Sequence, residues 1–403
     1  MAMKFGIVFA AAALLASAAP LSAAPVKLTM WTQDRSGVTG ALVDEFNKSQ
    51  DKIEVELADR DFSSLVSDLT RAFATGNAPD IVEVDNPELS VFSSRNLLLD
   101  LTDRAAKAKN FDVAKMLPGM RDAGTWKGHL YGIPKAANTI ALYYNADMFR
   151  KKGLDPDKPP KTWDELAKAA AVLNDPAAKV SGLGLSAAAN EEGTFQFLPF
   201  VQMKGANYDN LNSPGAIDAL TFWSTLYRSG NVIPDAISAG QWDLTAVFNA
   251  GGTAMTISGP WELKRMSETA KFEWRVALLP TPDAQSPRSS ALGEFMHGIN
   301  AKTAHPDEAF AAIDWFHSRD NQLWNRFGYI PGFQVDFQPE RFADAYAVFA
   351  EQIKYARVRG PEPQWPKISK AIQTAIQDSL TGQTDPTTAL KTAAATISTV
   401  LGK

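Results

Sequence analysis

Hydrophobic positions follow two different periods along the first part of the chain. The segments Val26–Trp31 and Ile53–Leu57 alternate apolar and polar residues as strands do. Each is followed by a segment with apolar residues three or four positions apart, as on one face of a helix. A third strand-like run, Ile81–Val84, follows the helix-ending Gly76. This order of strands and helices predicts an α/β fold with a mostly parallel sheet and helices on both faces.

The rest of the chain continues in the same style and becomes helical toward its end. Thr162 and Glu165 form a capping-box pattern, and Thr253–Ile257 reads as a strand before Pro260 begins another helix. No repeat or low-complexity linker separates the pieces, so we expect two α/β lobes between which the chain crosses more than once. In the last third, the helical pattern predicts helices over residues 306–316, 341–355, 368–380 and 386–401.

The first 23 residues have the pattern of a signal peptide. Lys4 precedes an apolar run over residues 5–16, which is too short to span a bilayer, and Pro20 follows it. We expect cleavage after Ala23. The chain contains no cysteine, so there is neither a disulfide framework nor a cysteine to carry a lipid anchor. These features predict an exported, unanchored protein of the periplasm.

Composition and charge exclude several classes of function. The 403 residues include 40 basic and 45 acidic side chains, for a net charge of −5. This charge argues against a nucleic-acid-binding protein, which would have an excess of basic residues. The four histidines show no metal-ligand spacing, and no phosphate-binding loop or serine-nucleophile motif occurs, so we expect no metal and no cofactor. Glu191 and Glu192 could be imagined as an acid/base pair, but a solvated loop is the favoured interpretation.

Several segments in a fixed order resemble the extracellular solute-binding proteins of ABC sugar importers, the broad family that includes maltose-binding protein. Each segment is weakly specific by itself, whereas the ordered set covers nearly the whole chain after residue 23. The matching segments are Leu28–Thr32, Phe73–Val82, Trp126–Pro134, Leu142–Asn145, Gly153–Pro156, Pro159–Leu166, Ala254–Trp261, His305–Ala309 and Gly328–Pro331.

The resemblance implies a two-lobed periplasmic binding-protein fold with three hinge crossings. By this match, the first lobe comprises residues 24–136 and 293–330, and the second comprises residues 137–292 and 331–403. The ligand would lie in the cleft between the lobes, and closure about the hinge would present the closed form to a membrane permease. We expect a monomer without catalytic activity.

A sugar site needs flat aromatic faces and a fan of polar groups, because a buried hydroxyl without a partner costs about 1–3 kcal/mol. Trp261 follows Gly259-Pro260, where the family places a stacking aromatic residue, and Arg359 matches a family arginine before a proline-rich turn. Glu294 stands where relatives often carry a second glycine, and His297 is its candidate partner. The candidate ligand-binding residues are Gln33, Asp34, Arg35, Asp85, Asn138, Trp242, Trp261, Glu294, His297 and Arg359.

Two other interpretations stay open at this point. An exported glycoside hydrolase or lyase would need two carboxylates at a defined separation, which no sequence spacing announces. The same fold could instead bind a polyol, a glycerophosphodiester or an anionic sugar derivative. An anion would be favoured by Arg35, Arg60 and Arg359, whereas Trp261 and Asp85 favour a neutral sugar.

Overall fold

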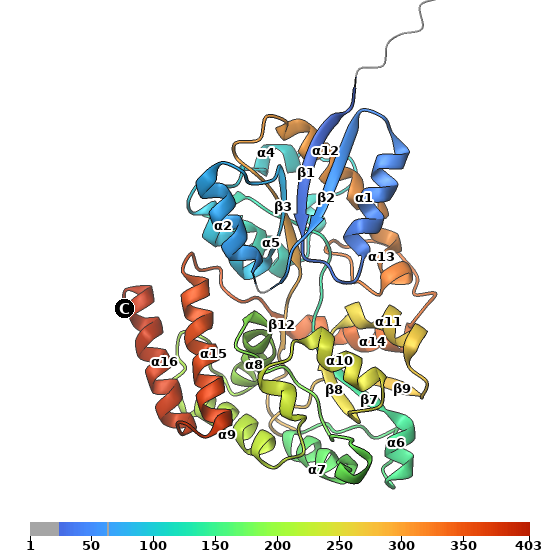
Figure 1. The fold of residues 1–403 in the computed structure, drawn as a ribbon, viewed down its shortest axis with the longest axis vertical. Helices are drawn as coiled ribbons and strands as arrows, with labels where there is room; N and C mark the ends of the chain where they lie inside the picture. Colours follow the sequence, from blue (N-terminus) through green and yellow to red (C-terminus); the bar gives the residue numbers. More distant parts are fainter. Residues whose placement is uncertain (1–23, 63) are drawn as a thin grey trace, which may run out of the picture.

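The computed structural model describes residues 24–62 and 64–403. The predicted signal peptide, residues 1–23, lies outside the described residues. The described chain forms two lobes stacked along the longest axis of the molecule, each with its own sheet (Figure 1). We call the lobe with the five-stranded sheet the first lobe and the lobe with the three-stranded sheet the second lobe.

The sheet of the first lobe has the strand order β2-β1-β3-β11-β6. β1 pairs in parallel with β2 and β3, as the sequence pattern predicts, but β11 runs antiparallel to both of its neighbours, β3 and β6. The sheet is therefore mixed, with β11 as the strand that runs opposite to the other four. The strands are β1 (Val26–Thr32), β2 (Ile53–Asp59), β3 (Ile81–Asp85), β6 (Ile133–Pro134) and β11 (Phe295–Ile299).

Helices cover both sides of this sheet, with α2 and α5 on one side and α1 and α13 on the other (Figure 1). Gly76 ends α2 in the left-handed conformation, as expected. Gly37 occupies the N-cap position of α1, and the hydroxyl of Ser36 before it accepts from the backbone N–H of Val38 at 3.4 Å. The helices of this lobe are α1 (Val38–Ser49), α2 (Leu65–Thr75), α3 (Leu89–Ser93), α4 (Thr102–Ala105), α5 (Pro118–Gly124), α12 (Pro306–Phe316) and α13 (Asp320–Phe327), and a small hairpin joins β4 (Thr125–Trp126) to β5 (His129–Leu130).

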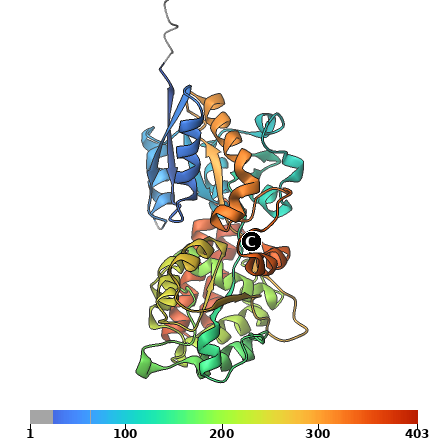
Figure 2. The ribbon, with the colours of Figure 1, turned by 90° about the vertical axis from the view of Figure 1, so that its right-hand side faces the viewer.

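The second lobe has an antiparallel sheet of order β8-β7-β9, surrounded mainly by helices (Figure 2). Thr162 caps α7 through the predicted capping box. The strands are β7 (Ala141–Asn145), β8 (Met255–Ser258) and β9 (Trp274–Ala277), and a separate pair joins β10 (Ser290–Ala291) to β12 (Ala356–Arg357). The helices are α6 (Ala146–Lys151), α7 (Trp163–Leu173), α8 (Glu191–Met203), α9 (Pro214–Arg228), α10 (Gln241–Asn249), α11 (Leu263–Thr269), α14 (Ala343–Gln352), α15 (Trp365–Thr381) and α16 (Pro386–Leu401).

The chain passes between the two sheets after β6, before β11 and after α13. One cluster of buried apolar residues includes Met30 and Val84 of the first-lobe sheet and continues to Tyr143 and Phe349 of the second lobe. The other cluster belongs to the helices and sheet of the second lobe. Shared packing around the passages explains why no flexible linker appears in the sequence.

Candidate functional site

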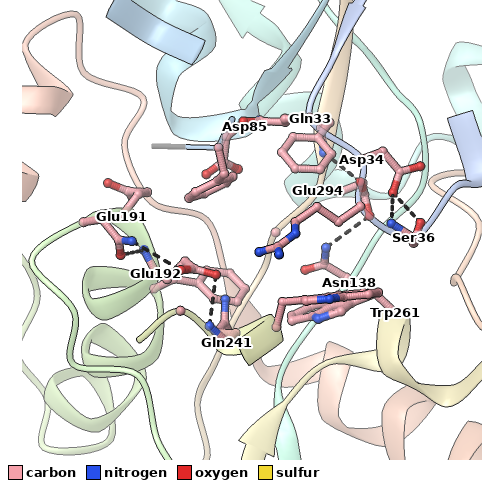
Figure 3. A pocket seen from close by; sticks show the side chains of 18 of the residues that line it. Gln33, Asp34, Ser36, Asp85, Asn138, Glu191, Glu192, Gln241, Trp261 and Glu294 are labelled. Carbon is pink, nitrogen blue, oxygen red and sulfur yellow. Dashed lines mark hydrogen bonds between the residues drawn. The ribbon is translucent and has the colours of Figure 1, made fainter. Parts of the chain in front are cut away.

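A cavity of about 310 Å³ lies between the lobes, where loops from both sheets meet. Figure 3 shows Gln33, Asp34 and Asp85 on the side of the first lobe, facing Glu192 and Trp261 on the side of the second. The carboxyl ends of parallel strands commonly form such sites, and β1 and β3 both end here. The other lining residues are Arg35, Ser36, Asp61, Phe62, Asn138, Asn190, Glu191, Phe195, Ser238, Gly240, Gln241, Trp242, Asp243, Gly293, Glu294, Phe295, Tyr329 and Arg359.

A buried lysine supports the first-lobe wall of the cavity. The Nζ atom of Lys135 lies 2.7 Å from Glu83 Oε1, 3.5 Å from Glu294 Oε1 and 3.7 Å from Asp34 Oδ2. All four side chains are 2% exposed or less. Of these, Asp34 and Glu294 reach the cavity, whereas Lys135 and Glu83 stand behind them. The lysine therefore allows three carboxylates to be buried close together.

The charges in this cluster depend on one another. Burial alone would raise the pKa of Glu83, but the nearby Lys135 and His297 lower it to about 2. Burial opposes the charge of Lys135 as well, yet Asp34, Glu83 and Glu294 hold its pKa well above the usual range. At neutral pH, Glu83 and Lys135 form a charged pair.

Glu294 occupies a strained position at the start of β11. Its φ angle is 143°, a region that favours glycine. Its carboxylate accepts hydrogen bonds from the Asn138 amide at 3.1 Å and from the Phe295 backbone N–H at 3.0 Å. Burial raises the pKa of Glu294, against the effect of Lys135. The strain indicates that the carboxylate, and not the backbone geometry, accounts for glutamate at this position.

Arg359 ties the two lobes together. Its Nη2 atom donates to Asp85 Oδ1 at 3.0 Å and Asn86 Oδ1 at 3.2 Å, both at the end of β3. Its Nη1 atom donates to Glu191 Oε1 at 2.5 Å, at the start of α8. The guanidinium also lies over the ring of Phe195, 4.5 Å from its centroid. Most of the donors of this buried side chain are thus occupied by protein groups.

Glu191 and Glu192 do not lie in a solvated loop, and the interpretation favoured from the sequence was wrong. They form the first turn of α8, capped by Asn190. Glu191 also accepts from Trp365 Nε1 at 3.0 Å, and burial raises its pKa against the opposing effect of Arg359. Glu192 accepts from the backbone N–H of Gln241 at 3.1 Å. Both carboxylates therefore belong to the wall of the cavity.

Aromatic rings form much of the remaining wall. The half-buried ring of Trp261 lies against the backbone of Gly259, where an added Cβ would come within 1.9 Å of the ring. Its ring centroid is 6.4 Å from that of Phe195. Trp242 is covered by the guanidinium of Arg265 at 3.9 Å. Of the two tryptophans of the cavity, Trp242 thus has a cation over its ring, whereas Trp261 has none among the described residues.

Nine of the ten candidate residues line the cavity, and His297 does not. The His297 ring is buried in β11 with Nε2 3.8 Å from Glu83 Oε2, and it lies beside Phe316. Glu294 precedes β11 and turns to Lys135 and Asn138 instead, so the proposed pairing with His297 is not found. Residues that the sequence analysis did not select include Phe62, Asn190, Phe195, Gln241, Phe295 and Tyr329.

Three buried polar atoms at the cavity have no hydrogen-bond partner among the described residues. They are Gln33 Nε2, Asn138 Oδ1 and Arg359 Nε. Buried polar groups are nearly always paired, and these three atoms are also closed off from the cavity, so each needs a local rearrangement to gain a partner. The described residues contain no group of three His, Asp or Glu side chains that could hold a metal ion. The arrangement is suited to binding a polar molecule through aromatic faces, donors and acceptors.

Comparison with known proteins agrees with this geometry. The family described as bacterial extracellular solute-binding protein matches residues 32–323. The chain belongs to this family. Across residues 24–62 and 64–403, no helix is long and apolar enough to cross a membrane.

Two solved structures and one relative by sequence illustrate the similarity. The structure is similar to that of an ABC transporter solute-binding protein from Thermotoga lettingae bound with α-D-tagatose, with 26% identity, a TM-score of 0.85, and coverage of 93% of this chain and 100% of that one. The structure is also similar to that of the maltose-bound MalE3 of T. maritima, with 26% identity, a TM-score of 0.84, and coverage of 93% of this chain and 100% of that one. The sn-glycerol-3-phosphate-binding periplasmic protein UgpB of Escherichia coli K12 is 29% identical over 286 residues, which cover 64% of this chain and 63% of UgpB.

Proposed function

We propose that this protein is the periplasmic receptor of an ABC importer and that it captures a carbohydrate between its lobes. The observation that carries the proposal is the interlobe cavity, whose wall combines aromatic rings with carboxylate, amide and guanidinium groups. The relatives that bind tagatose, maltose and sn-glycerol 3-phosphate support a ligand with several hydroxyl groups. A wall of this kind matches such a ligand, since a sugar has apolar C–H faces and polar hydroxyl edges.

We assign roles to the residues from their geometry. Trp261 offers a flat face for a sugar ring. Asp34, Glu294 and Glu192 are acceptors for hydroxyl groups, and the side-chain amides of Gln33 and Asn138 belong to the same wall. Asp85 and Arg359 complete the wall where the lobes meet. No step of this function requires bond cleavage.

We propose that the hinge follows the three passages between the sheets. The first lobe would then comprise residues 24–136 and 293–330, and the second residues 137–292 and 331–403. The segment before residue 24 would be removed on export, leaving an unanchored monomer that delivers its ligand to membrane permease subunits. Binding at a cleft between two lobes favours closure, because the bound molecule contacts both of them.

Two measurements test this proposal. Thermal unfolding with a panel of sugars and polyols should reveal stabilising ligands, since a ligand at 100 times its Kd adds about 2.7 kcal/mol. Small-angle X-ray scattering should then show a smaller radius of gyration with the stabilising sugar than without it. The proposal fails if no sugar or polyol raises the melting temperature, and closure fails if the scattering curves coincide at saturation.

A further inference from the structure

The cavity wall is strongly acidic. Among the described residues, seven carboxylates and two guanidiniums line it. The carboxylates are Asp34, Asp61, Asp85, Glu191, Glu192, Asp243 and Glu294, and the guanidiniums are Arg35 and Arg359. An anion entering this space meets an excess of like charge at short range, in surroundings that screen charge less than water does.

Both arginines are engaged by carboxylates of the protein. Arg359 is held between Asp85 and Glu191, so that its charge is shared between two acids. Arg35 lies at the rim, with Nη2 3.6 Å from Asp243 Oδ1 and a side chain that is 60% exposed. An ion pair with so exposed a side chain is screened by water and salt. Arg359 therefore has no free pair of Nη donors for a phosphate or a carboxylate, and the charge of Arg35 is weakened by solvent at the rim.

The helix N-termini at the cavity are also occupied by acidic groups. Such termini commonly bind phosphates through unpaired backbone N–H groups. Here Asp34 accepts from Thr39 N–H at 2.8 Å near the start of α1. Glu192 lies in the first turn of α8 and accepts from Gln241 N–H at the start of α10. The protein therefore fills these positions with its own carboxylates.

From this charge distribution we infer that the site takes a polyhydroxylated ligand without an anionic group and rejects the phosphorylated or carboxylated form of the same molecule. Hydroxyl groups can donate to the carboxylates of the wall, and they can also accept from its donors. A phosphate or carboxylate group only accepts, and here it faces mainly acceptors. The inference rests on the proposed function and narrows its ligand class, away from the glycerol phosphate that UgpB is named for.

Matched pairs of probes test the inference on the full processed protein. The neutral probes are D-tagatose, D-mannitol, glycerol and maltose, and their anionic partners are D-tagatose 6-phosphate, D-mannitol 1-phosphate, sn-glycerol 3-phosphate and maltobionate. Calorimetric titration should give, for each pair that binds, at least 100-fold weaker binding of the anion. An anion that binds as tightly as its neutral partner, or more tightly, would overturn the inference while leaving the proposed receptor function intact. If no member of any pair binds, the proposed carbohydrate function fails, and this inference fails with it.

A charge variant provides a second test. Glu192→Gln removes one negative charge from the wall and keeps the acceptor for Gln241 N–H. We call the ratio of the Kd of an anion to the Kd of its neutral partner the gap, and we expect this variant to reduce the gap at least fivefold. Glu268→Gln changes the net charge equally at an exposed position outside the cavity and should leave the gap unchanged. An unchanged gap in Glu192→Gln, or an equal change in both variants, would contradict the role of the wall carboxylates.

Discussion

The buried lysine behind the cavity gives the sharpest prediction about stability. Lys135→Met keeps an unbranched side chain of similar length but leaves Glu83, Asp34 and Glu294 buried without a cation. The fall in the pKa of Glu83 from 4.5 to about 2 corresponds to about 3 kcal/mol of stability at pH 7. Removing one partner of a buried ion pair typically costs about 3–5 kcal/mol. We therefore expect Lys135→Met to lower the free energy of unfolding by about 3 kcal/mol at pH 7.

The pH dependence distinguishes this mechanism from simple loss of packing. In the parent protein, Glu83 has a depressed pKa, so its contribution is complete above about pH 5 and decreases as the pH falls from 4.5 toward 2. In Lys135→Met, burial without the cation should raise the pKa of Glu83 above 4.5, and acid then removes the uncompensated charge. The difference in stability between the two proteins should accordingly be larger at pH 7 than at pH 4.

Urea unfolding followed by tryptophan fluorescence measures this difference at both pH values. Lys27→Met is the matched control, because Lys27 pairs with Glu54 and Glu56 at the surface and its side chain is 64% exposed. Exposed pairs contribute about 0–1 kcal/mol, so the control should change stability little. A free energy of unfolding for Lys135→Met within about 1 kcal/mol of the parent at pH 7, or an equal difference at pH 4, would show that Lys135 does not stabilise the buried carboxylates.

Two further substitutions test the wall of the cavity. Gly259→Ala should weaken sugar binding at least tenfold in calorimetry with little change in melting temperature, because its Cβ would displace the Trp261 ring; unchanged affinity would contradict this placement. Arg359→Lys keeps the charge but cannot bridge Asp85 and Glu191 with a planar fork, so we expect at least tenfold weaker binding, about 1.4 kcal/mol or more. If Arg359→Lys binds the sugar as tightly as the parent, the contacts of Arg359 with Asp85 and Glu191 do not contribute to ligand binding.

Much of the fold was predictable because its elements carry local signals. The periods of β1, β2 and β3, the capping box at Thr162 and the proline at the start of α16 each lie within a few residues of the element that they mark. The direction of β11 was not predictable in this way. Its partners, β3 and β6, lie far away in the sequence, and no local pattern specifies whether such a strand runs parallel or antiparallel.

The residues of the site also differ in whether a local sequence signal marks them. Gln33, Asp34 and Asp85 could be selected because they follow strands whose carboxyl ends meet at one edge. Glu191 and Glu192 were missed, although Asn190 followed by two glutamates is a signal for a helix start. Lys135 could not have been selected, since its three carboxylates come from separate segments and only the folded structure brings them together.

Calorimetric titration of a stabilising neutral sugar into the parent protein and into Trp261→Ala tests most directly whether the sugar binds between the lobes. We expect saturable binding of one sugar per parent molecule. We expect Trp261→Ala, while still folded, to bind about 30- to 1,000-fold more weakly, from a loss of about 2–4 kcal/mol in stacking and buried area. Equal affinity in the two proteins would show that the sugar does not lie against Trp261, and the interlobe cavity would no longer be its binding site.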